Sequence, residues 1–197
     1  MKLTYKKSKG FTLVELLVVV AIIATLAAIA TPITLSAIKK AQITESRSVC
    51  VAFEAAVDNF EAEYNYLPFN GGGQAPTRDT DDAPIRSDED IVAVLAGVED
   101  ELNFKQIAFF EYREPKSGTN RTNYKNGMAV DDQAGTALLY DPWGEPYYIV
   151  MDYDLDGRVD NPLDRSEEIS TKCAIYSLGK DKVGGTSAKN RDNATNF

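Results

Sequence analysis

The sequence predicts an α+β protein in which one long N-terminal helix packs on a small antiparallel β-sheet. Three observations lead to this fold class. The chain has 197 residues, and the run from Leu16 to Ile38 carries no charge, which is long enough to cross a bilayer core of ~30 Å as a helix. A helical, amphipathic pattern continues to about Tyr64, and strand-like segments separated by turn signals occupy residues 136–197.

The N-terminal part combines a basic leader, residues 1–10, with an apolar membrane segment, residues 11–38. The leader carries four lysines and no acid, which favours a cytoplasmic N-terminus and places the rest of the chain on the exported side. A secretory signal peptide fits less well, because its apolar core has about 7–15 residues and ends at a cleavage site. We therefore expect one membrane-spanning helix.

Glu15 is the one charged residue of the segment 11–38. A carboxylate in a membrane helix costs about 2–3.5 kcal/mol on insertion scales, so it usually has a partner. Cleavage after Gly10 would create an ammonium on Phe11, four residues before Glu15. Both groups would lie on one helical turn, so we expect them to pair between neighbouring copies shifted along the helix axis. The alternative is a carboxylate that extends to the headgroup region without a role.

The segment Lys9–Leu16, KGFTLVEL, resembles the class III signal of type IV pilins and type II secretion pseudopilins. The resemblance implies a pilin fold and cleavage between Gly10 and Phe11 by a membrane aspartyl prepilin peptidase. It also implies N-methylation of Phe11 and polymerisation with Glu15 as the assembly residue. Pro32 matches the proline that this family often has in its apolar segment, where it removes one helix hydrogen bond and loosens the preceding turn.

Charge and composition disfavour several classes of protein. The net charge is −9, and loss of the four leader lysines lowers it to −13. An acidic exported domain does not attract nucleic acid by bulk electrostatics, although a local basic patch stays open. The chain contains no histidine, which excludes Ser–His, Cys–His and His–metal chemistry. We therefore do not expect an enzyme, while a lysine-based site stays open.

Residues 39–67 continue the helix as its amphipathic second half. Apolar side chains recur every three or four residues, and neither glycine nor proline occurs between Pro32 and Pro68. We expect this helix to end at about Tyr64 and to turn its apolar stripe toward the core of a globular domain, residues 68–197. The stripe consists of Phe53, Val57, Phe60, Tyr64 and Leu67.

Residues 69–135 are rich in glycine, proline and aspartate, so we expect mainly variable loops there. A short helix should begin after Ser87, whose side chain would cap it ahead of three acids and an apolar face. Gln106–Tyr112 is typical of a strand or a buried connector.

Residues 136–197 are expected to form the antiparallel sheet. The sequence Asp141–Gly144, DPWG, has the residues of a type I turn. This turn and the segment Tyr176–Asp181, YSLGKD, resemble the C-terminal half of type II secretion major pseudopilins. Residues 69–135 are longer than that family suggests. The expected strands are Thr136–Tyr140, Tyr147–Asp152, a segment around Arg158–Asp160, and Ala174–Leu178.

Cys50 lies on the predicted helix and Cys173 begins a strand-like run. An exported chain enters an oxidising compartment, so a disulfide can form if the strand packs against the helix beside Cys50. The alternative is a pair of buried thiols that act as small apolar side chains.

Two acidic segments have ligands for calcium. The first segment begins at Asp152 and has most features of an EF-hand loop, with carboxylates at every second place and a glycine at the sixth. Leu163, however, occupies the twelfth place, where the bidentate acid is expected. The interpretation that we favour here is a β-hairpin that turns at Leu155–Gly157, with solvated aspartates at its edge. The carboxylates of this segment are Asp152, Asp154, Asp156 and Asp160.

The second segment follows the predicted last strand. In major pseudopilins a calcium ion is held after a Ser-Leu-Gly-x-Asp motif, so the resemblance assigns the carbonyl of Leu178 and the carboxylate of Asp181 to it. Ala188 stands where a second acid is expected, and Asp192 is the only later acid. The alternative is an ordinary polar tail.

The function that the resemblance implies is structural. The mature chain would be a filament subunit, most specifically the major pseudopilin of a type II secretion system that drives protein export. Alternatives are a type IV pilin for adhesion or motility, and a membrane-tethered binding module or enzyme. Expected partners are other copies of the chain, the prepilin peptidase, the inner-membrane assembly platform, minor pseudopilins and the membrane, but no nucleic acid. The expected location is the inner membrane, single-pass, with the globular domain in the periplasm and the filament there or at the cell surface.

Overall fold

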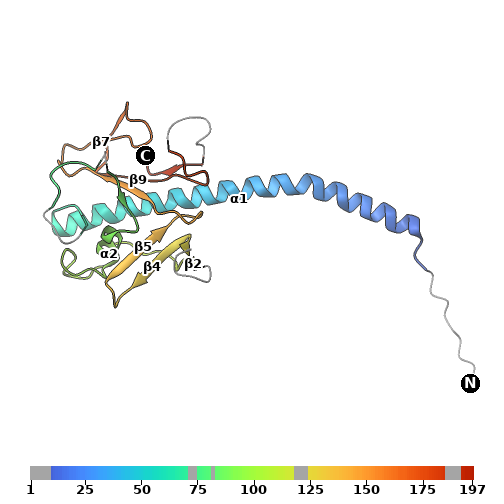
Figure 1. Cartoon of the computed structure of the whole chain (residues 1–197), viewed down its shortest axis with the longest axis horizontal. Helices are drawn as coiled ribbons and strands as arrows, with labels where there is room; N and C mark the ends of the chain where they lie inside the picture. The colour runs from blue at the N-terminus through green and yellow to red at the C-terminus, as the bar shows by residue number, and fades with distance from the viewer. Residues whose placement is uncertain (1–9, 71–74, 81–82, 118–123, 185–191) are drawn as a thin grey trace, which may run out of the picture. The chain divides into compact units, whose positions relative to one another are not determined.

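The computed structural model describes residues 10–70, 75–80, 83–117, 124–184 and 192–197. The chain divides into two compact units, Met1–Ala41 and Gln42–Phe197. We call the second unit the head. Helix α1, Leu13–Tyr64, contributes to both units, and all strands belong to the head (Figure 1).

In the first unit, α1 is apolar and its side chains are exposed. It is the one helix among the described residues that is long and apolar enough to span a membrane, and none of its most apolar window is buried. The hydroxyls of Thr25, Thr31 and Thr34 donate to backbone carbonyls one turn earlier, at 2.8–3.0 Å. Such bonds satisfy the polar groups of a helix in an apolar medium. The unit therefore has the properties of a membrane anchor.

In the head, the continuation of α1 supplies one side of the core, as the periodicity predicts. The whole predicted stripe is buried, and Phe53, Val57 and Phe60 have no exposed surface. The helix ends at Tyr64, and Asn65 follows in the left-handed region with φ 62°, a conformation that asparagine tolerates at a helix end.

A four-stranded antiparallel sheet packs against this part of α1, which confirms the predicted α+β fold (Figure 1). Its central pair is β6–β9, in which Tyr148 lies opposite Tyr176 and Met151 lies opposite Cys173. Alternate side chains of this pair, such as Ile149 and Ile175, join the core with α1. The strands in order are β1 (Ile85–Arg86), β6 (Tyr148–Met151), β9 (Cys173–Ser177) and β10 (Ala194–Thr195).

The opposite face of the sheet has a second, smaller core. Val150, Ala174 and Tyr176 lie on this face, and Val159 covers them from the segment between β6 and β9. Tyr148 and Tyr176 stack across the strands with ring centroids 5.4 Å apart. The sheet is therefore covered on both faces, which is consistent with the continuous burial of β9.

Two expected strands exist but pair elsewhere. The segment β5, Thr136–Tyr140, forms a separate hairpin with β4, Gly127–Asp131, in a region expected to be loop. The segment β7, Val159–Asp160, pairs with β8, Glu168–Ile169, and not with β6. A further short antiparallel pair consists of β2, Lys116–Ser117, and β3, Tyr124–Lys125. The sheet is completed by β1 and β10, whose two-residue lengths leave no periodic signal.

The short helix α2, Asp90–Ala96, is present, but Ser87 does not cap it. The Ser87 hydroxyl is buried, donates to the carbonyl of Leu139 at 2.7 Å and accepts the N–H of Tyr147 at 2.7 Å. It thereby links β5 to the start of β6. Residues 106–112 form a connector without strand pairing, and Phe110 buries its side chain in the core.

Candidate functional site

The predicted cleavage site lies just outside the helix. Gly10, Phe11 and Thr12 precede the first helical residue, Leu13, and all are exposed. A Cβ added at Gly10 would meet no atom within 4 Å. The Gly10–Phe11 peptide bond is therefore accessible and free of helical hydrogen bonding, as a peptidase substrate has to be.

Thr12 and Glu15 form a reciprocal capping box at the start of α1. Both the N–H and the hydroxyl of Thr12 donate to Glu15 Oε2, at 2.9 and 2.8 Å. In return, Thr12 Oγ1 accepts the N–H of Glu15 at 3.2 Å. The box satisfies donors of the first turn that have no partner within the helix.

Glu15 thus has a partner on its own helix, which the sequence reasoning missed. The two expected alternatives were the ammonium of Phe11 on a neighbouring copy and a carboxylate without a role. The signal was available as the pattern Thr-x-x-Glu before an apolar run, which is typical of a helix N-terminus. The contact of Glu15 with a second copy stays a prediction.

The expected hairpin at Leu155–Gly157 is wrong, because β7 turns away from β6 and pairs with β8. The segment keeps instead the first half of an EF-hand-like loop. The buried carboxylate of Asp152 accepts the N–H groups of Asp156 and Gly157, at 3.1 and 2.8 Å. Gly157 has φ 84°, a left-handed conformation that a glycine allows at the sixth loop place.

Asp79 adds a carboxylate to this loop from a distant part of the chain. Its Oδ1 accepts the N–H groups of Tyr153 and Asp154, at 2.9 and 3.2 Å. Ligand atoms of Asp79, Asp152 and Asp154 lie within 4.8 Å of one another. Burial, followed by the charges of Asp154 and Asp152, raises the pKa of Asp79, against hydrogen bonds that lower it. No local pattern marks Asp79 as a partner of this loop, because it lies more than 70 positions before Asp152.

The expected fourth carboxylate of this segment lies elsewhere. Asp160 is on β7, where it faces Glu168 across the two-stranded ladder. Asp156 accepts the N–H of Arg158 at 2.8 Å. Neither joins the cluster of carboxylates that the described residues form around Asp79.

The C-terminal loop brings Asp192 back to the segment after β9. Asp192 Oδ2 accepts the N–H of Lys180 at 2.9 Å. The amide of Asn193, oriented as a donor, lies 3.0 Å from the carbonyl of Leu178 and 3.3 Å from that of Val183. Asp181 accepts the N–H of Val183 at 3.0 Å. Residues 185–191, which include Ala188, lie outside the described residues.

Both cysteines are buried and both thiols are free in the structure. Cys50 lies in the core on α1, with its Sγ 3.7 Å from the carbonyl of Ala194. Burial raises the pKa of both thiols, so neither is a reactive thiolate at neutral pH. A disulfide between them in the exported protein stays untested, and thiol labelling decides between the two alternatives.

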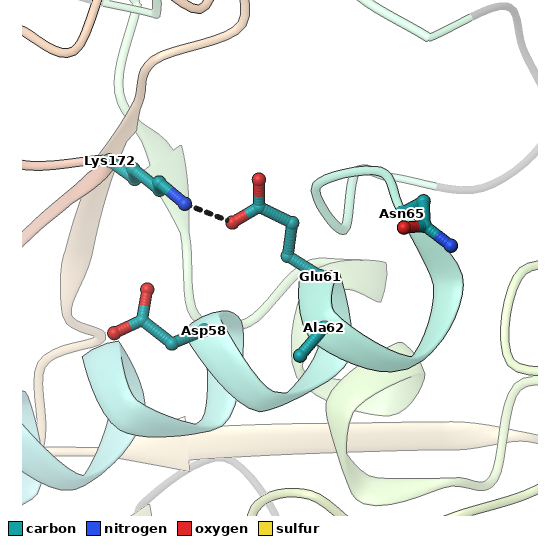
Figure 2. A pocket seen from close by; sticks show the side chains of 5 residues that line it. All are labelled: Asp58, Glu61, Ala62, Asn65 and Lys172. Atoms are coloured by element: carbon teal, nitrogen blue, oxygen red, sulfur yellow. Dashed lines mark hydrogen bonds and ion pairs between the residues drawn. The ribbon is translucent and has the colours of Figure 1, made fainter.

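A polar hollow of about 630 Å³ lies on the exposed face of α1 in the head. In Figure 2, Asp58 and Glu61 project from the helix, and Lys172 approaches from the segment before β9 to bind Glu61 at 2.6 Å. Burial raises the pKa of Asp58. The charge of Lys172 opposes this effect and lowers the pKa, whereas the charges of Glu54 and Glu61 raise it further. Glu61 and Lys172 thus form an ion pair at the open surface of this hollow.

The exposed segment at Gly10 and Phe11, the capped apolar helix and the α+β head are the features of a membrane-anchored protein with an N-terminal signal. A family model described as the prokaryotic N-terminal methylation motif matches residues 5–31. This segment contains Gly10, Phe11 and Glu15, and the match is consistent with the type IV pilin-like family. Neither the curated proteins nor the solved structures give a match to the chain.

Proposed function

We propose that the protein is the subunit of a pilus-like filament, specifically the major pseudopilin of a type II secretion system that drives protein export. The observation that carries this proposal is the methylation motif at residues 5–31, in which Glu15 is the one carboxylate of the apolar segment 11–38 and lies in the first turn of α1. The DPWG turn and the YSLGKD segment support a pseudopilin over an adhesion or motility pilin.

In the proposed mechanism, cleavage releases the ammonium of Phe11, and this ammonium binds Glu15 of a neighbouring copy. The exposed apolar side chains of α1 are suited to cover one another in a helical bundle once the subunit leaves the membrane. The charge pair determines the axial offset between neighbouring helices, because an unpaired carboxylate in that bundle is costly. Prepilin peptidase, an inner-membrane assembly platform and minor pseudopilins are the partners that this mechanism requires, with the head in the periplasm.

In the proposed function, the C-terminal loop binds a calcium ion. The carbonyl of Leu178 and the carboxylates of Asp181 and Asp192 are the hard oxygen ligands that calcium prefers. The contact between Asp192 and Lys180 supports this site, because it holds a carboxylate from the end of the chain beside the segment after β9. The bound ion would tie the C-terminus to the sheet. The cluster around Asp79 is the alternative site.

The test of the assembly contact compares Glu15→Gln with Glu15→Ala in the full-length chain. Glutamine accepts the same hydrogen bonds in a capping box but carries no charge. If the charge pair drives assembly, both variants should yield at least about tenfold fewer sheared filaments at equal membrane levels, a loss equivalent to about 1.4 kcal/mol. Mass spectrometry should show methylated Phe11 as the N-terminus in all three proteins.

Normal filament yield from Glu15→Gln would show that the charge is not the assembly contact. A mature chain that still begins at Met1 would contradict the filament-subunit assignment as a whole. Loss of an exported hydrolase from the culture medium in a deletion strain supports secretion, whereas unchanged export together with lost surface adhesion would contradict it.

A further inference from the structure

We propose that the C-terminal end of the membrane anchor binds one anionic phospholipid, whose phosphate contacts the ammonium of Lys40 and the hydroxyl of Ser36. The site lies on α1 within residues 32–40, which all belong to the first unit. It depends on insertion of the anchor into a membrane and not on polymerisation, so it goes beyond the proposed contact at Glu15.

A hollow of about 450 Å³ lies on one face of α1 near the end of its uncharged run. The small side chains of Ser36 and Ala37 leave room between Ile33 and Lys40. Residues 31–40 are all exposed, so this face meets lipid when the anchor is in a bilayer. The lining residues, which recur every three or four positions along the helix, are Pro32, Ile33, Ser36, Ala37 and Lys40.

Ser36 differs from the threonines inside the same helix. The hydroxyls of Thr25, Thr31 and Thr34 donate to backbone carbonyls, which satisfies them in an apolar medium. Within the part of the chain that the structure describes, the Ser36 hydroxyl makes no hydrogen bond. A hydroxyl without a partner is costly in lipid, and a phosphate oxygen at the edge of the hollow would be its acceptor.

Lys39 and Lys40 place two positive charges directly after the uncharged run. No acid stands three or four positions from either lysine, and among the described residues neither forms an ion pair. The nearest acid along the chain, Glu45, is bound by Arg113 and Asn126. Both ammonium groups are therefore available to an anion from outside the described chain.

The position of these lysines favours the phosphate of a lipid. The uncharged run from Leu16 to Ile38 is about 35 Å long as a helix, so it crosses a hydrocarbon core of about 30 Å and brings Lys40 to the headgroups. Lys40 follows Ser36 by four positions, so both lie on the same face, one turn apart. The lysine stem can extend along the apolar surface while its ammonium reaches the phosphate.

The same charges disfavour a second copy of the chain as the occupant. A parallel copy at the same depth would bring its own Lys39 and Lys40 to this level, and like charges repel. Its uncharged run also has no carboxylate to offer them. An anionic lipid instead supplies an acyl chain for the hollow beside Ile33 and Ala37, and a negative charge for the lysines.

The experiment uses the full-length chain in bilayer nanodiscs of phosphatidylcholine with phosphatidylglycerol as the anionic component. Native mass spectrometry counts the lipid that the protein retains after release. We expect a preference for phosphatidylglycerol and an about fivefold loss of it in Lys40→Gln, equivalent to about 1 kcal/mol. Ser36→Ala should also lower the retained amount, whereas Lys40→Arg, which keeps the charge, should restore it.

Two matched controls remove the same groups elsewhere and should retain the lipid normally. Lys116→Gln removes a charge from an exposed position on the head, and Thr34→Val removes a hydroxyl that already has an acceptor.

Equal retention of both lipids overturns the site, as does an equal loss in Lys40→Gln and Lys116→Gln. A dimer of the unsubstituted chain that retains no lipid would show that the hollow takes a second copy, which also overturns it. Filament yield does not enter this measurement, so these failures leave the proposed contact at Glu15 intact.

Discussion

Replacement of Asp141 by alanine should destabilise the head more than any other change in the turn between β5 and β6. Asp141 is fully buried. Its Oδ1 accepts the N–H groups of Trp143, Gly144 and Glu145, at 2.9, 2.8 and 2.9 Å. Its Oδ2 accepts the hydroxyl of Ser177, on β9, at 2.6 Å. One side chain therefore accepts the N–H groups of the turn and links the turn to β9.

The magnitude follows from the donors that lose their acceptor. A buried polar group without a partner costs about 1–3 kcal/mol. Trp143, Gly144 and Glu145 are half-buried, so water reaches part of the turn, and the lower end for three N–H groups gives about 3 kcal/mol. In a domain of this size that loss lowers Tm by about 6–12 °C. Asp141→Asn should cost less, because the amide oxygen still accepts the three N–H groups.

The assay is urea and thermal unfolding of the head, residues 42–197, within which all core residues lie. The matched control is Asp131→Ala. Asp131 accepts the N–H groups of Gln133 and Ala134 at an exposed turn, so its loss should cost less than about 1 kcal/mol. A cost of Asp141→Ala no larger than that of Asp131→Ala, or equal costs for Asp141→Ala and Asp141→Asn, would refute the reasoning.

The same variants have a pH dependence of defined sign. Burial raises the pKa of Asp141 above its ordinary value of 3.8, against the hydrogen bonds of Ser177 and the turn, which lower it. A raised pKa in the fold means that this group stabilises the head most below pH 3.8, and that this contribution is lost as the pH rises through the raised pKa. The destabilisation by Asp141→Asn should therefore be larger at acid pH than at pH 7.

Two further predictions concern the thiols and calcium. After denaturation without reductant, a thiol reagent should label both Cys50 and Cys173, and an unlabelled chain two mass units lighter would show that the exported protein is bridged. Calcium should raise the Tm of the head by mass action, with a gain of about 2.7 kcal/mol at 100 times Kd. Asp192→Asn should remove this gain if the C-terminal loop binds the ion, and Asp154→Asn should remove it if the cluster around Asp79 does. A head whose Tm does not respond to calcium contradicts both sites.

The parts of the fold that the sequence predicts well are those set by local pattern. The end of α1 at Tyr64 and its buried stripe follow from a periodicity that covers only neighbouring residues. The DPWG turn is likewise local, because Asp141 accepts the N–H groups of Trp143, Gly144 and Glu145. The N-terminal methylation motif is recognisable for the same reason, since it is one continuous segment, matched at residues 5–31.

The parts that the sequence does not predict depend on pairing over distance. Strand β5 could be recognised, but not its partner β4, because strand pairing is decided by the whole fold and not by the strand's own residues. Ser87 resembles a helix cap locally, yet its hydroxyl is used between β5 and β6. Asp79 contacts Tyr153 across a large sequence separation, so the contact depends on how the loop that carries Asp79 packs in the fold.

The DPWG turn and the YSLGKD segment of the C-terminal half form one physical unit. Ser177 of the second motif donates to Asp141 of the first at 2.6 Å and accepts the N–H of Gly179 at 3.0 Å. Gly179 has φ 72°, and a Cβ there would come within 2.6 Å of the Asp192 carbonyl. Asp141 thus holds, through Ser177, the backbone at Gly179 against which Asp192 lies. A loss of the calcium response in Asp141→Ala, at a temperature where the head is still folded, would follow from this connection.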